Sequence, residues 1–418
     1  RSPGAPTSWS RRVAVEYGSL PFKEQVEFLR NKINLPSSDW TQLWQEGHDH
    51  GFVVSGANKD ALVADFHDAI NRTAAEGRTL QDFRKDFDRI VAEHGWSYKG
   101  SRGWRSRVIY ETNLRTSYAA GRYAHMQEVS ATRPYWRYRH SDAVLTPRPE
   151  HLAWDGLVLA ADDPWWQTHY PPNGWGCQCY VETLSERDLD RLGKSGPDNA
   201  PATEWETKTV GAQGAHPRTV RVPNGIDPGF GYAPGATAWT EPLAEQAMSA
   251  GAAYRAGDWE RLITTTFADY ARPERLPLER APVPLSQPLN TEQETIAATA
   301  RAIGGAYKVY DVRGLPVAVD AQVLGKRVDP RRAEYLPLLN DLLTDPYEVW
   351  LSLERAQTGY YQLRSRVIKA YDLGPRGRGL LLVAQQAGGY LESWTFVEPE
   401  RMSYLNNQRQ GKLWWGKK

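Results

Sequence analysis

The stretch Trp104–Val129, WRSRVIYETNLRTSYAAGRYAHMQEV, has the longest helical pattern in the chain, and Tyr135–His140, YWRYRH, follows it after Pro134. Apolar residues at helical spacing predict an α-helix over the first stretch, and alternation in the second predicts a β-strand. Small residues at positions 119–121 indicate that another helix packs closely against this one. The apolar residues thus change from helical spacing to alternation. This change predicts a helical region that is followed by a small β element from about residue 131.

Four further helical patterns lie upstream of this stretch. The last of them begins after Thr79, which has Asp82 in the capping-box position, and it closes at Gly95. The predicted helices run from Pro21 to before Pro36, from Asp39 through Trp44, from Lys59 to Gly77 and from Thr79 to Gly95.

Two short motifs follow the predicted strand. Leu152–Leu159 contains the pair Asp155-Gly156, which predicts a β-hairpin with a tight two-residue turn. Ser185 with Asp188 then predicts the start of a short helix that ends at Gly193.

Residues 196–294 are rich in Gly, Pro, Ala and Thr, with one helical stretch near Leu243–Tyr270. This composition predicts a long extended linker or arm. After it, a helix over Glu292–Ile303 precedes a series of strands, which indicates an α+β domain with an antiparallel sheet. These strands are predicted at Tyr307–Tyr310, Tyr347–Leu351, Ser365–Tyr371, Leu380–Ala384 and Ser393–Val397.

A chain of 418 residues is longer than a single core usually supports, so we predict a multidomain α+β protein. Its parts are an N-terminal arm (1–20), a helical domain with the small β element (21–195), the Gly/Pro-rich linker (196–294) and the antiparallel-sheet domain (295–418). No stretch approaches about 20 consecutive apolar residues, so the sequence gives no indication of membrane insertion. No signal-peptide core is present at the N-terminus, so we expect no secretion.

Charge is distributed unevenly along the chain. The overall formal charge is +1, but residues 301–418 hold 18 Lys/Arg against 12 Asp/Glu. The C-terminal part is therefore the better candidate for touching nucleic acid, although an inert surface can carry the same net charge.

The two cysteines, Cys177 and Cys179, lie too close together in the sequence to join distant segments by a disulfide. With His151 and either His140 or His169 they offer sulfur and imidazole ligands suited to tetrahedral zinc, which would stabilise a thin β element. The alternative is that both cysteines are packed residues and His151 is hydrogen-bonded to a backbone carbonyl. A Cys177–His151 nucleophile is a weaker hypothesis, because no third residue orients the pair.

The most distinctive motifs are PRPEHLAWDG (147–156), DDPWW (162–166) and PPNGWGCQCY (171–180), together with YETNLRTSYAAGR (110–122) upstream. In these motifs the chain closely resembles the Mu F-like minor head proteins of tailed phages, over about residues 20–195. The resemblance implies a role in head morphogenesis, with the portal protein and the major capsid protein as partners and an oligomeric arrangement in the virion. The protein would then be found at the head or portal vertex, and in the host cytoplasm during assembly.

Residues from about 301 resemble a second family, the phage-borne barnase, EndoU, colicin and RelE-like nucleases. The matching motifs are DPYEVW (345–350), SWT (393–395) and YLNNQRQGKLWW (404–415). The resemblance implies RNA cleavage, which needs a base, an acid and cations for the phosphate. No histidine follows His216, so a metal-independent endoribonuclease would have to use other residues. The candidates are Glu348, Arg366, Lys369, Tyr404 and Arg409.

Two hypotheses remain open at this stage. In the first, the protein is a structural head component and not an enzyme, and its C-terminal domain docks or contacts packaged DNA. In the second, the N-terminal part addresses the protein to the virion, and the C-terminal domain is a ribonuclease delivered to host RNA.

Overall fold

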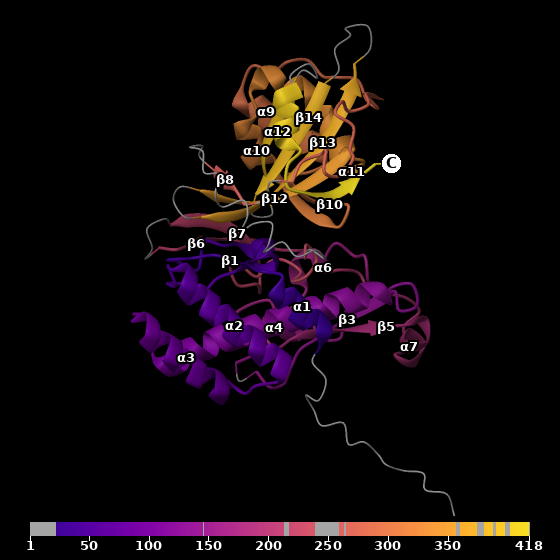
Figure 1. Ribbon diagram of the computed structural model, residues 1–418. Coiled ribbons are helices and arrows are strands. Elements are labelled where there is room, and N and C mark those ends of the chain that lie inside the picture. The colour runs from indigo at the N-terminus through magenta and orange to yellow at the C-terminus, as the bar shows by residue number, and fades with distance from the viewer. Residues whose placement is uncertain are drawn as a thin grey trace, which may run out of the picture.

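The computed structural model describes residues 22–144, 146–212, 217–238, 259–262, 265–356, 360–373, 380–387, 390–397 and 402–417. A region of helices and short strands forms the N-terminal part, and a large sheet with its helices lies above it in Figure 1. This architecture confirms the predicted fold class. The predicted arm, residues 1–20, lies outside the described residues.

Four α-helices build the N-terminal part: α1 (Lys23–Arg30), α2 (Asp60–Glu76), α3 (Leu80–His94) and α4 (Arg102–Glu128). The predicted ends of α2 and α3 are confirmed, since Gly77 and Gly95 both adopt the left-handed conformation. Thr79 and Asp82 form the predicted capping box, which satisfies two free N–H groups of α3. Phe66, Phe83 and Phe87 fill the core between these helices.

The helix predicted from Asp39 through Trp44 is wrong. Turns occupy this stretch, and the 3-10 helix η1 (Gln45–Asp49) follows them. Short strands flank the turns and η1, β1 (Ile33–Asn34) before them and β2 (Gly51–Phe52) after them, and the two strands pair in parallel. The side chain of Gln42 accepts hydrogen bonds from the backbone N–H groups of Ser38 and Asp39, at 2.6 and 3.2 Å. Such local bonds compete with helix formation.

The small β element is a three-stranded antiparallel sheet. Strand β3 (Tyr135–Arg139) is central, between β4 (Val158–Ala160) and β5 (Tyr180–Leu184). The hairpin predicted over Leu152–Leu159 is wrong, because Pro149 begins a short helix, α5 (Pro149–Ala153), that takes up its first half. Two further short helices are α6 (Trp166–His169) and α7 (Glu186–Arg191), and α7 begins at the predicted capping box of Ser185.

The segment predicted as an extended linker contains ordered strands. Strands β6 (Trp205–Val210) and β7 (Arg218–Pro223) form a hairpin, while β8 (Trp259–Arg261) and β9 (Glu279–Arg280) join the C-terminal sheet. Residues 243–258 of the predicted helix near Leu243–Tyr270 lie outside the described residues, and its end is wrong because β8 is a strand.

The C-terminal sheet has the order β10-β11-β15-β14-β13-β12-β16, with β8 beside β12 and β9 beside β13. Most neighbours are antiparallel, but β11 pairs with β15 and β9 with β13 in parallel. Its strands are β10 (Tyr307–Val312), β11 (Leu315–Asp320), β12 (Glu348–Ala356), β13 (Tyr361–Asp372), β14 (Leu380–Ala387), β15 (Tyr390–Val397) and β16 (Lys412–Gly416). Its helices are α9 (Glu292–Ile303), α10 (Ala321–Arg327), η2 (Pro330–Leu338), α11 (Leu339–Thr344) and α12 (Met402–Gln408).

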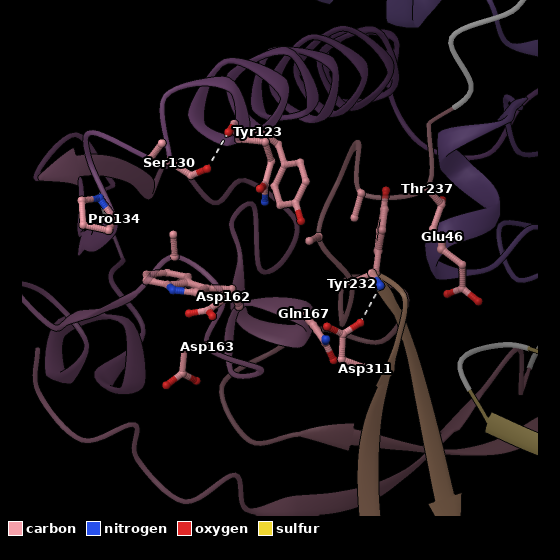
Figure 2. Close-up of a pocket in the computed structure, with 17 residues that line it drawn as sticks. Glu46, Tyr123, Ser130, Pro134, Asp162, Asp163, Gln167, Tyr232, Thr237 and Asp311 are labelled. Carbon is pink, nitrogen blue, oxygen red and sulfur yellow. Dashed lines mark hydrogen bonds between the residues drawn. The ribbon is translucent and has the colours of Figure 1, made fainter. Parts of the chain in front are cut away.

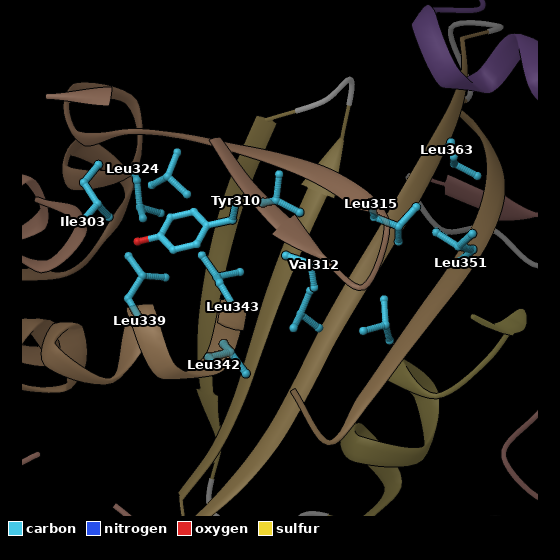
Figure 3. Packing of buried hydrophobic residues seen from close by; sticks show 14 of the residues in the cluster. Ile303, Tyr310, Val312, Leu315, Leu324, Leu339, Leu342, Leu343, Leu351 and Leu363 are labelled. Carbon is cyan, nitrogen blue, oxygen red and sulfur yellow. The ribbon is translucent and has the colours of Figure 1, made fainter. Parts of the chain in front are cut away.

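The two faces of this sheet pack differently. On one face, α9, α10 and α11 cover an apolar core whose side chains are drawn in Figure 3. On the other face, Trp350 and Ile368 contact the 267–276 segment and Tyr404 of α12. Strand residues alternate between these faces, so neighbouring positions on β12 and β13 have different surroundings.

The N-terminal and C-terminal parts are in direct contact. Leu35 and Leu43 belong to the same apolar cluster as the C-terminal core. The backbone N–H of Tyr361 also donates to the carbonyl of Gln42 at 2.8 Å. Among the helices in the described ranges, none has the length and apolar character that a membrane span requires.

The small residues of α4 do pack closely against another helix, as predicted. A Cβ atom on Gly121 would lie 2.9 Å from the backbone nitrogen of Gln25 in α1 and 2.7 Å from the ring of Phe22. The side chain of Gln25 also donates to the carbonyl of Leu114 and to the hydroxyl of Ser117.

We therefore expect Gly121→Val to lower the free energy of unfolding by about 1–3 kcal/mol, because it overpacks this contact. Chemical denaturation of the purified chain measures the change. The control is Gly103→Ala near the start of α4, where an added Cβ meets only the end of the Arg84 side chain, at 3.9 Å. Equal stability of the two variants would contradict the close-packing interpretation.

Candidate functional site

Three of the predicted metal ligands come together beside the small sheet. His151 lies on α5, while Cys177 and Cys179 lie in the loop that leads into β5, and all three are buried. Their ligand atoms lie within 4.8 Å of one another. The Nδ1 atom of His151 is 3.9 Å from the sulfur of Cys177 and 3.5 Å from that of Cys179.

The spacing of these atoms suits a tetrahedral metal. Zinc–sulfur and zinc–nitrogen bonds at the tetrahedral angle separate the two ligand atoms by about 3.6 Å. The other ring nitrogen of His151, Nε2, lies 2.9 Å from the carbonyl oxygen of Gly225. Since a carbonyl only accepts hydrogen bonds, Nε2 carries the proton and the lone pair of Nδ1 faces the sulfurs.

The two thiols are also electrostatically coupled. A hydrogen bond from the Cys179 thiol lowers the pKa of Cys177, whereas the same partnership and burial raise the pKa of Cys179. The cluster therefore favours one thiolate next to one thiol. A thiolate is the form of cysteine that binds metal.

The two candidates for a fourth ligand differ in position. Nδ1 of His140, directly after β3, lies 3.6 Å from the sulfur of Cys179. His169 instead stacks on the ring of Trp165 at 4.2 Å, and its Nδ1 lies 3.1 Å from the Trp165 carbonyl. Burial lowers the pKa of His169 to about 3, so it is a neutral core residue. Of these two histidines, His140 is the one beside the cluster, where it contacts Cys179.

A segment far downstream closes over this centre, and the sequence did not indicate it. Besides the contact of Gly225 with His151, the carboxylate of Asp227 accepts hydrogen bonds from Arg148 at 2.5 Å and from the backbone of Trp175 at 2.8 Å. A Cβ on Gly225 would lie 2.6 Å from Glu150, and its φ of 80° favours glycine. The run Pro223-Asn224-Gly225 marks a turn but gives no sign of what the turn touches.

In the C-terminal part, Glu348 is fully buried within a group of donors. Arg409, also fully buried, forms two hydrogen bonds to its carboxylate at 2.7 and 2.8 Å. Arg272 and the indole N–H of Trp350 donate to the same carboxylate at 2.9 and 2.8 Å. Glu348 and Arg409 lie together, as a shared catalytic site would require. Their side chains, however, form a buried ion pair with each other.

Arg366 lies on the same face of the sheet in a second buried network. Its guanidinium donates to Glu354 at 2.6 Å and to Ser352 at 2.7 Å. Burial raises the pKa of Glu354, but the charges of Arg366, Arg364 and Arg261 outweigh it and bring that pKa below its usual value. Sequence reasoning missed Glu354 and Arg272, because nothing local distinguishes them from other charged residues.

The remaining two candidates differ in position. Lys369 lies on the opposite face of the sheet, where it contacts Asp341 and Asp345 at 2.9 Å. Tyr404 is partly buried against the apolar group around Trp350, the residue that donates to Glu348. Four of the five predicted catalytic residues therefore lie on one face of the sheet, and Lys369 is separated from them.

Two stretches of the chain match models of known families. Residues 64–182 match the family described as "Phage Mu protein F like protein", and this stretch contains the Cys/His cluster. Residues 294–416 match the family described as "phage-Barnase-EndoU-ColicinE5/D-RelE like nuclease2". The chain thus combines a phage Mu F-like domain with a nuclease-like domain, as both resemblances predicted.

Two curated relatives are similar to part of the chain. The "Putative capsid assembly protein F" of Escherichia phage Mu is 34% identical over 191 residues, which are 42% of this chain and 43% of that protein. The "Mu-like prophage FluMu F protein" of Haemophilus influenzae is 34% identical over 183 residues, 41% of this chain and 44% of that protein. The chain therefore matches less than half the length of either relative. No solved structure matches it.

The buried pair yields a prediction for stability. Glu348→Gln leaves the charge of Arg409 buried with one neutral partner, and breaking a buried ion pair in this way costs about 3–5 kcal/mol. We expect the C-terminal unfolding transition in calorimetry to move to lower temperature. Arg331→Ala is the matched control, because it breaks an exposed pair with Asp329 in which the arginine side chain is 85% exposed. A shift no larger than that of the control would refute the structural role of the pair.

Proposed function

We propose that the protein is a structural component of a tailed-phage head that acts in capsid assembly and head morphogenesis. The observation that carries this proposal is the Mu F-like domain at residues 64–182, together with the phage relative whose name describes capsid assembly. The portal protein and the major capsid protein are the proposed partners, at the portal vertex of the virion. The contact between the two parts of the chain supports a structural role, since it holds the C-terminal domain against the Mu F-like part.

We further propose that the Cys/His cluster holds a structural zinc ion. His151, Cys177 and Cys179 would bind it, and His140 would complete four ligands, a set without an open position for catalysis. The hydrogen bond from His151 to Gly225 supports this proposal, because metal-binding histidines usually donate their second N–H to an oxygen. Zinc would strengthen a small sheet whose strands have only three to five residues.

A ribonuclease activity of the C-terminal domain is the second candidate function. The match of residues 294–416 to a nuclease family favours it. The burial of Glu348, Arg366 and Arg409 in ion pairs weighs against these residues as its catalytic set, since a general base must reach the proton it removes. A docking or DNA-contacting role of the domain does not require these residues to act in catalysis.

The zinc proposal predicts one zinc per chain in protein purified without added metal. Elemental analysis should show its loss in the double variant Cys177→Ser/Cys179→Ser, with a lower melting temperature. His125→Gln is the control, because His125 lies on α4 beside Glu24 and outside the cluster. Absence of zinc from the parent protein after growth in zinc-containing medium would exclude the proposal.

The head-protein proposal and the nuclease alternative are separated by two measurements on the full-length chain. Deletion of residues 64–182 should abolish infectious heads in a complementation assay, whereas Tyr404→Phe should not. The purified chain should leave RNA uncut under conditions in which a reference ribonuclease is active. RNA cleavage that Tyr404→Phe reduces at least about tenfold, as expected for loss of an acid–base group, would favour the ribonuclease.

A further inference from the structure

A cavity of about 460 Å³ lies in the N-terminal part of the chain, against the first half of α4. Its other walls come from the stretch 40–48, the segment 53–55 and the loops around Trp175 and Phe230. The volume is in the range of small-molecule sites. Trp104 and Trp175 line the cavity and are 54% and 44% exposed, so two large indole rings border its open side.

The walls of the cavity are mainly apolar and aromatic. The ring centroid of Trp175 lies 6.2 Å from that of Trp40 and 5.0 Å from that of Phe230, and both contacts are edge-to-face. Trp40 in turn lies 5.9 Å from Trp44, and Val108 of α4 adds an aliphatic side chain. Contacts between the rings hold them in place, so the cavity offers a preformed apolar surface.

The charged side chains around this cavity are basic. Lys32 and Arg105 line it, whereas none of its lining residues is Asp or Glu. The acidic residues Glu46, Asp162 and Asp311 border a separate cavity, which Figure 2 shows. An anion between the tryptophan rings would therefore meet positive charge and no carboxylate.

Lys32 carries an ammonium group that has no acceptor. The residue is only 5% exposed, and its Nζ atom lies 4.4 Å from the centre of the Phe28 ring. Within the described ranges, the side chain of Lys32 forms no hydrogen bond and no ion pair. Nζ is nevertheless not one of the fully buried, unpaired side-chain atoms, so the exposed area of Lys32 includes Nζ, and the cavity is the space that this residue lines. A ligand that accepts a hydrogen bond there would relieve the cost of burying an unpaired charge.

This buried lysine remains a cation near neutral pH. Burial lowers the pKa of Lys32 to about 8, although the charge of Asp49 raises it. The carboxylate of Asp49 is taken up by the N–H groups of Gly235 and Thr237. Burial and the charge of Lys32 lower the pKa of His48 to about 3, so this imidazole, which also lines the cavity, is neutral.

We propose that this cavity binds a free apolar monocarboxylate of the fatty-acid type, with its carboxylate at Lys32 and its hydrocarbon chain against the tryptophan rings. One buried cation matches one negative charge at the end of an apolar body. A polypeptide segment is a poorer fit, because each of its residues brings an N–H and a C=O that need partners when buried. The site shares no residue with the Cys/His cluster or with the nuclease-like domain.

The test is titration of the full chain with decanoate, below its micelle concentration, by isothermal calorimetry. We expect one saturable site per chain, and binding at least about tenfold weaker in Lys32→Met, because a hydrogen bond to a charged group is lost. The melting temperature of Lys32→Met should not fall, since the variant removes a buried charge that lacks an acceptor. The control Lys308→Met removes a lysine that also lies 4.4 Å from an aromatic ring, that of Tyr310, but outside the cavity. It should bind decanoate like the parent.

A second variant tests the cavity without changing any charge. Val108→Trp fills part of the space beside α4, so it should abolish decanoate binding in a folded chain.

Four results would overturn the proposal. The first is the absence of saturable decanoate binding to the folded parent chain. The second is equal affinity for decanol or decyltrimethylammonium, which would show that the cavity selects apolar chains without using Lys32. The third is an equal loss of affinity in Lys308→Met, which would indicate diffuse attraction to positive charge. The fourth is binding of the peptide N-acetyl-Trp-Glu-amide that depends on Lys32 while decanoate does not bind, which would make the cavity a protein-docking site instead.

Discussion

The hydrogen bond between His151 and the carbonyl of Gly225 ties the proposed zinc site to the 223–238 segment. It orients the imidazole toward the cysteines and holds the 223–238 segment against the N-terminal part. Asp49 holds the same segment further along, where its carboxylate accepts the N–H groups of Gly235 and Thr237 at 2.9 and 3.1 Å.

In the C-terminal sheet, buried ion pairs hold segments that are distant in the sequence together. Glu348 and Glu354 point to the same face of β12, and each is surrounded by arginines from other elements. Partners for both glutamates come from before α9, at Arg261 and Arg272. Removing these charged side chains from water costs free energy unless each one is paired. The segments that supply the arginines must therefore lie against β12 for the sheet to be stable.

The features that the sequence predicted well are local ones. Capping residues and glycines determine helix ends through contacts within a few positions, as at Thr79 and Gly95, and alternation predicts β3 because one face of that strand is buried. The Cys/His cluster was predictable because chemistry restricts which side chains bind zinc. The turns near Asp39 were missed because the Gln42 side chain accepts a hydrogen bond from the backbone N–H of Ser38, and hydrophobic spacing does not reveal such a bond. Spacing already argued against one part of the catalytic set, because Arg366 and Lys369 lie three positions apart on one strand and therefore face opposite sides of the sheet.

The pairing of β8 and β9 with the large sheet also bears on where the C-terminal structural unit begins. The nuclease-like match begins at residue 294, but two strands of the sheet and two of its partly buried arginines come from residues 259–280. A unit cut at residue 294 would lack both strands, and it would remove Arg261 from Glu354 and Arg272 from Glu348. A unit that carries the complete sheet therefore begins at or before Trp259, inside the stretch whose composition resembles a simple spacer.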